Sequence, residues 1–131
     1  MGLRYFGTPE MLKIGQVAVI VNYGEEISSI LMIHSGVADQ WQLPGLEYHP
    51  DNDLSNAIDE ACGIKCDLDP CEFKIRNRIL YLTYYGTVDK IDHNTLDKDF
   101  RWISLYDLHR GKVVVESQSK ELIESMFPVI E

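Results

Sequence analysis

Two hydrophobic runs near the start of the chain, residues 16–23 and 27–34, are rich in β-branched side chains and are separated by a short polar connection. Such runs predict strands, and the short connection favours an antiparallel pair. In the first run, apolar residues occupy both alternating sets of positions. Because both faces of that strand would then be apolar, we expect a buried central strand.

A turn and a short helix follow these strands. Pro44-Gly45 predicts the end of a strand, because proline has no N–H to donate and glycine accepts positive φ. Apolar residues then recur at helical spacing from Leu54 to Ala61, and Gly63 stands where a left-handed cap usually ends a helix. We expect any chemistry to lie where this loop meets the helix.

The second half of the chain has its longest strand pattern over residues 73–88, where alternating positions predict one long two-faced strand. Residues 89–99 are hydrophilic and predict a loop. Residues 1–13 are a lead-in in which Thr8-Pro9-Glu10 is typical of a turn or a helix start. The remaining predicted elements are a strand over residues 100–103, a serine-capped helical turn over 104–108 and a helix over 117–126.

Length and composition narrow the class of protein. A chain of 131 residues is the size of one domain that buries its core without disulfides, so we treat residues 1–131 as a single domain. Cys62, Cys66 and Cys71 match neither a Cys-x-x-Cys redox pair nor a zinc module, so we expect reduced, partly buried thiols.

Charge and hydropathy exclude two kinds of partner. The formal net charge of −9 opposes strong non-specific binding to nucleic acid, because contacts with phosphates need a surplus of Lys and Arg. The apolar run at residues 17–21 is too short to span a bilayer, and no charged leader precedes a signal-type segment. We therefore expect no membrane association and a cytoplasmic protein.

Two motifs resemble the Nudix hydrolase family: Leu43-Pro44-Gly45 before the helix, and Arg101-Trp102-Ile103-Ser104-Leu105-Tyr106-Asp107-Leu108 after the long strand. With the closing helix, the resemblance spans roughly residues 14–127. It implies a fold of the α/β (α+β) class, an α-β-α sandwich around a mixed β-sheet. The family motif, G-x5-E-x7-R-E-U-x-E-E-x-G-U with U apolar, holds a divalent metal against a diphosphate through glutamates that share one helix face.

This chain departs from that motif at the carboxylates. When the motif is aligned backwards from Gly63, Glu60 takes the first position of the E-E pair, whereas Ala57 and Ala61 replace the two carboxylates that would share a metal. The interval from the Pro-Gly turn to Gly63 is also shorter than in the family by about one helical turn. Because a methyl group cannot ligate a cation, we expect the family's metal site to be degraded.

Several polar residues remain candidates for a site. Glu60 would be the catalytic residue of an active enzyme and, with Asp59, a ligand of Mg or Mn, although solvated surface charge accounts better for both residues. Arg76 and Arg78 share one face of the predicted strand and could grip phosphate oxygens, or be solvated. The candidates for binding a ligand are Glu47, Arg76, Arg78, Asp97 and Asp99, although turn chemistry alone explains the two aspartates. Asp51 and Asp53 could extend an acidic site, although solvated loop charge accounts better for them.

Aromatic residues offer a stacking surface for a nucleobase. The candidates are Trp41, Tyr81, Tyr84, Tyr85 and Trp102, although packing around the motif helix accounts better for the two tryptophans.

Three functions follow from these patterns. The first is a Nudix-fold binding or regulatory module for a nucleotide-like ligand or a protein partner, with no certain cofactor and no ordinary hydrolase activity. The second is a pyrophosphohydrolase dependent on Mg or Mn, acting on a nucleoside diphosphate derivative through Glu60 and relocated acids. The third is a structural subunit that pairs with another chain.

Overall fold

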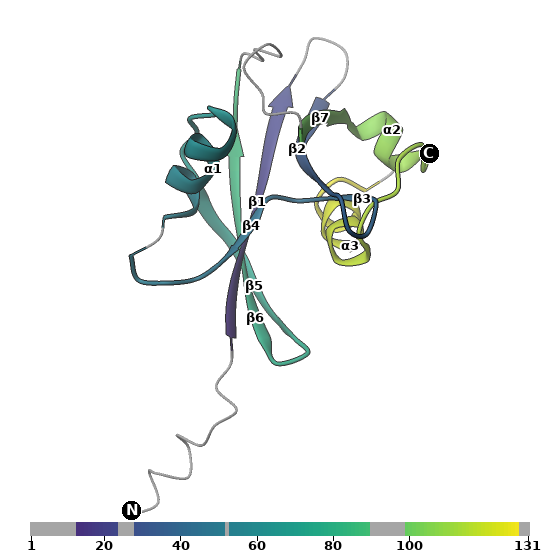
Figure 1. Cartoon of the computed structure of the whole chain (residues 1–131). Helices are drawn as coiled ribbons and strands as arrows, with labels where there is room; N and C mark the ends of the chain where they lie inside the picture. The colour runs from purple at the N-terminus through teal and green to yellow at the C-terminus, as the bar shows by residue number, and fades with distance from the viewer. Residues whose placement is uncertain (1–12, 24–27, 52, 90–98, 129–131) are drawn as a thin grey trace, which may run out of the picture.

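A computed structural model of the chain describes residues 13–23, 28–51, 53–89 and 99–128 (Figure 1). Thr8-Pro9-Glu10 and Asp97 lie outside the described residues. The strands are β1 (Lys13–Tyr23), β2 (Ser28–Ser35), β3 (Gln40–Gln42), β4 (Gly45–Glu47), β5 (Asp69–Arg76), β6 (Ile79–Thr87) and β7 (Phe100–Ser104). The helices are α1 (Leu54–Cys62), α2 (Leu105–His109) and α3 (Ser117–Met126).

The strands form one mixed sheet in the order β3-β2-β1-β6-β5, with β4 paired to β1 and β7 paired to β2. β1 runs antiparallel to β2 and parallel to β6, in a register that pairs Lys13 with Ile79 and Val21 with Thr87. The segment from Ala18 to Val21 is fully buried. The predicted buried central strand and its antiparallel partner are therefore confirmed.

The two faces of β1 pack against different helices (Figure 1). Ala18 and Ile20 lie in a cluster with the apolar residues of α1, whereas Val19 and Val21 lie in a cluster with Ile123 of α3. Because successive side chains of a strand point to opposite faces, one apolar run in the sequence supplies both layers. The sheet is thus covered by α1 on one side and by α2 and α3 on the other, which confirms the α-β-α sandwich that the Nudix resemblance implied.

Helix α1 begins and ends where its sequence predicts. The Asp53 carboxylate caps the N-terminus by accepting a hydrogen bond from the Ser55 amide at 3.0 Å. Gly63 ends the helix with φ of 78°, a left-handed conformation that strains other residues. The buried residues Leu54, Ile58 and Cys62 form the stripe that packs on the sheet.

The prediction of a single long strand over residues 73–88 is wrong. The chain forms an antiparallel hairpin there, because Asn77 and Arg78 turn it with φ of 50° and 65°. Positive φ at both central residues is typical of the tight turn that suits strand twist. Asn-Arg contains no glycine, so the strand-like alternation on both sides concealed the turn. The expectation that Arg76 and Arg78 share one strand face is therefore also wrong, because Arg78 lies in the turn.

The C-terminal elements match their predictions. Ser104 caps α2 by accepting a hydrogen bond from the Asp107 amide at 3.0 Å, and α3 covers the predicted residues. Cys62, Cys66 and Cys71 form no disulfide with one another, and Cys62 is buried. None of the helices in the described ranges is long and apolar enough to cross a membrane.

Candidate functional site

A cavity of about 660 Å³ lies between the sheet and α3. Its floor comes from paired positions: Gly15 of β1 lies beside Tyr81 of β6, and Val17 lies beside Thr83. Paired residues of neighbouring strands place their side chains on the same face of the sheet. On that face, β5 adds Glu72, Lys74 and Arg76, and α3 closes the other side with Gln118, Ser119, Glu121, Leu122 and Ser125.

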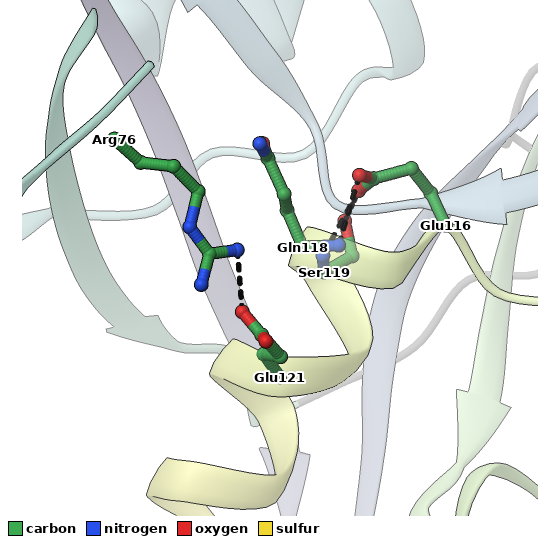
Figure 2. Close-up of polar contacts among 5 residues, drawn as sticks. All are labelled: Arg76, Glu116, Gln118, Ser119 and Glu121. Atoms are coloured by element: carbon green, nitrogen blue, oxygen red, sulfur yellow. Dashed lines mark hydrogen bonds and ion pairs between the residues drawn. The ribbon is translucent and has the colours of Figure 1, made fainter. Parts of the chain in front are cut away.

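An ion pair joins the two walls of the cavity. The Arg76 guanidinium at the end of β5 lies 2.5 Å from a carboxylate oxygen of Glu121 on α3 (Figure 2). The hydrogen bond and charge of Arg76 hold the pKa of Glu121 below its usual value, and the hydrogen bond and charge of Glu121 raise the pKa of Arg76. Both groups are thus charged at neutral pH.

The start of α3 is fixed to the sheet by hydrogen bonds around Ser119. The Glu116 carboxylate accepts bonds from the amides of Gln118 and Ser119, each at 2.9 Å, and from the Ser119 hydroxyl at 2.9 Å (Figure 2). The same hydroxyl oxygen accepts a bond at 3.0 Å from the amide of Leu43, which follows β3. The wall made by α3 is therefore held in place, and the Glu116 carboxylate is occupied as the helix cap.

The candidate metal ligands lie on α1, on the opposite side of the sheet from the cavity. Glu60 is exposed and Asp59 half-buried, and adjacent helical residues point about 100° apart. Ala57 and Ala61 are helical in this same segment. Within the described ranges, no three His, Cys, Asp or Glu side chains gather as metal ligands would. The described residues of α1 therefore do not fit the carboxylate site for Mg or Mn that the Nudix resemblance implied.

The other candidates are dispersed. Glu47 is exposed at the end of β4, Arg78 is exposed in the hairpin turn, and Asp99 is exposed before β7, where its carbonyl accepts a bond at 2.7 Å from the His34 amide. Of the described ligand candidates, Arg76 is the one that lines the cavity.

The aromatic candidates also divide. Tyr81 lines the cavity, whereas Trp102 is buried in the cluster under α1. Trp41 packs instead on the cluster beneath α3, with the Arg101 guanidinium 4.9 Å from its ring centre. Trp102 therefore packs beside the motif helix as expected, whereas the same expectation for Trp41 is wrong, because Trp41 packs on the opposite side of the sheet.

Sequence reasoning missed the contribution of α3. Ser119 is buried on the same stripe as Ile123, four positions along the helix, which is where an apolar residue is expected. A polar residue on that stripe was the available signal. The sequence contained no signal for Glu121, because an exposed glutamate on a helix is commonplace and its partner Arg76 is distant in the sequence.

Comparisons with known proteins identify the fold through structure. No family model matches this sequence, and no curated protein sequence matches it. A Nudix family hydrolase from Clostridium perfringens superposes with a TM-score of 0.69 at 12% identity, covering 91% of this chain and 98% of that chain.

Two further solved structures are similar over a comparable length. The C-terminal domain of mouse MUTYH, in complex with human PCNA, has a TM-score of 0.66 at 15% identity and covers 89% of this chain and 99% of that chain. The Nudix domain of Shewanella oneidensis NrtR, complexed with ADP ribose, has a TM-score of 0.64 at 16% identity and covers 96% of both chains. At such low identity the likeness concerns the fold alone. The chain therefore has the Nudix-like fold of these proteins, an α-β-α sandwich around a mixed sheet.

Proposed function

We propose that this Nudix-fold chain is a binding or regulatory module that holds a nucleotide-like, phosphate-bearing small molecule in the cavity beside α3. The observation that carries the proposal is the cavity itself, with Arg76 in its wall. Its volume of about 660 Å³ lies within the range of small-molecule sites. This concave shape favours a small ligand over a protein partner.

The lining supplies the chemistry that a nucleotide needs. The planar guanidinium of Arg76 matches two phosphate oxygens at once, and Lys74 adds a second positive charge on the same strand face. Gln42 and Gln118 offer neutral donors and acceptors, and Tyr81 contributes an aromatic ring beside which a base can pack.

The helix that carries the Nudix motif supports binding without ordinary hydrolysis. Ala57 and Ala61 take the positions of the paired carboxylates, and Glu60 is exposed on the other side of the sheet from the cavity. An anion gripped by Arg76 would therefore lie away from Glu60. Gly63, the glycine that this chain shares with the motif, ends the helix, and the Asp53 cap begins it.

We expect ADP-ribose, the ligand of the similar NrtR domain, to bind this protein in the presence of EDTA. Replacing Arg76 with glutamine should weaken binding about tenfold, because a charge-assisted contact with phosphate is lost. Isothermal titration calorimetry measures both affinities. Arg110→Gln removes the same charge outside the cavity and should change the affinity less than twofold.

Two results would contradict the proposal. One is the absence of ADP-ribose binding at millimolar concentration. The other is turnover of ADP-ribose when Mg or Mn is supplied, which would favour the alternative of a metal-dependent pyrophosphohydrolase. In that case Glu60→Gln should abolish the turnover, whereas full activity of this variant would exclude Glu60 as the catalytic residue.

A further inference from the structure

We propose that Glu121 acts as an internal stand-in for the anionic group of the ligand, so that an incoming phosphate must displace it from Arg76. We call the contact between these two side chains the Arg76–Glu121 latch. The inference rests on the proposed function, because it states how the same cavity is regulated and which ligands it selects.

The latch spans the cavity from one wall to the other. Arg76 is the last residue of β5, and Glu121 lies on α3, so the pair joins the hairpin to the helix across the space where a ligand would lie (Figure 2). Both side chains line the cavity, and their charged atoms are 2.5 Å apart. A carboxylate in this position makes the contact that a phosphate oxygen would otherwise make.

The charges around the latch oppose an anion while the latch is closed. Among the described residues that line the cavity, the other charged side chains are Glu72, Lys74 and Glu116. With Arg76 neutralised by Glu121, Lys74 alone faces two carboxylates. A phosphate that entered would meet a net negative surrounding, so its recognition depends on release of the Arg76 guanidinium.

The latch can open without disturbing the fold. The side chains of Arg76 and Glu121 are 33% and 58% exposed, and ion pairs this accessible to water are weak. α3 is held separately by Ser119 and by buried Ile123. A group with two negative charges competes better for the guanidinium than a single carboxylate does. The latch thus selects ligands with a doubly charged phosphate or a pyrophosphate over neutral or singly charged ones.

Calorimetric titration with inorganic pyrophosphate in EDTA tests the latch without the nucleoside. Glu121→Gln should tighten pyrophosphate binding about fivefold. In the native protein, only the molecules in which Arg76 is released from Glu121 can bind, and the apparent affinity is lowered in proportion to that fraction. Glu124→Gln is the matched control: it removes the same charge from an exposed position of α3 that does not line the cavity, and we expect a change below twofold.

A second pair of variants shows whether the gain passes through Arg76. In an Arg76→Gln background, Glu121→Gln should produce no more change than Glu124→Gln does. The latch is overturned if Glu121→Gln and Glu124→Gln have equal affinities for pyrophosphate in the native background. It is also overturned if Glu121→Gln still tightens pyrophosphate binding when Arg76 is replaced.

The latch and the proposed function fail in different ways. If ADP-ribose does not bind but Glu121→Gln still tightens pyrophosphate binding, the nucleotide function is wrong and the latch stands. If ADP-ribose binds and Glu121→Gln matches its control, the latch is wrong and the function stands.

Discussion

Replacing Gly86 with alanine should lower the free energy of unfolding by about 3 kcal/mol, because the added methyl group has no space. Gly86 is buried in β6, where it pairs with Ile20 of the central strand. A Cβ atom built there would lie 2.4 Å from the sulfur of Cys66, 2.8 Å from the Asp67 carbonyl oxygen and 2.9 Å from Leu68. All three distances are shorter than van der Waals contact.

The neighbours of Gly86 cannot simply move aside. The single S–H of Cys66 is shared between the carbonyl oxygens of Asp67 and Thr87, each 3.5 Å from the sulfur, and burial raises the pKa of this thiol so that it keeps its proton. Leu68 packs on the cluster beneath α1. The backbone carbonyl of Asp67 can shift only if the chain leading into β5 shifts with it. Relief of the clash therefore costs packing between β6 and this segment.

Urea denaturation measures the effect, and Gly36→Ala is its matched control. A Cβ at Gly36 would meet nothing within 4 Å, so that variant should stay within about 0.5 kcal/mol of the native protein. Equal urea midpoints for the two variants would show that the segment from Cys66 to Leu68 does not pack closely enough against Gly86 to exclude a methyl group.

Elements whose signals are local could be predicted from the sequence. The extent of α1 follows from the helical spacing of its apolar residues after Leu54 and from Gly63, and both faces of β1 follow from one uninterrupted apolar run. The expectation that Ala57 and Ala61 replace paired carboxylates likewise comes from the sequence, and it stays a prediction. Each of these features depends on neighbours within a few residues.

Features that depend on tertiary pairing could not be predicted. The Asn77-Arg78 turn lacks glycine, and only the antiparallel pairing of β5 with β6 reveals it. The hairpin directs Arg76 toward α3, which is why Arg76 meets Glu121 and Arg78 does not line the cavity. The candidate site consequently lies on the face of the sheet opposite the motif helix, where the sequence did not predict it.

Ser119→Ala should destabilise the fold by about 2 kcal/mol and also weaken ligand binding. The hydroxyl of Ser119 is buried, donates to Glu116 and accepts from the Leu43 amide. Alanine would leave that amide without its partner in a buried position, and an unsatisfied buried donor costs about 1–3 kcal/mol. The greater helix propensity of alanine offsets only a few tenths of this.

The binding effect follows from the position of Ser119 between the two parts of the cavity wall. Its hydroxyl ties Leu43, in the connection from β3 to β4, to the first turn of α3, and both residues line the cavity. Without that tie the wall loosens, and the positions of Gln118 and Glu121 relative to Arg76 are less well defined. We expect ADP-ribose affinity to fall severalfold in the folded variant.

Ser125→Ala separates these effects from the general consequences of replacing serine on α3. Ser125 lines the cavity near the end of the same helix. Because its side chain is exposed, its replacement should change the free energy of unfolding by less than about 0.5 kcal/mol. Urea denaturation and calorimetric titration of both variants provide the comparison. If Ser119→Ala is as stable as Ser125→Ala, the hydrogen bond to Leu43 does not anchor α3, and the rigidity of the cavity wall must come from apolar packing around Ile123 instead.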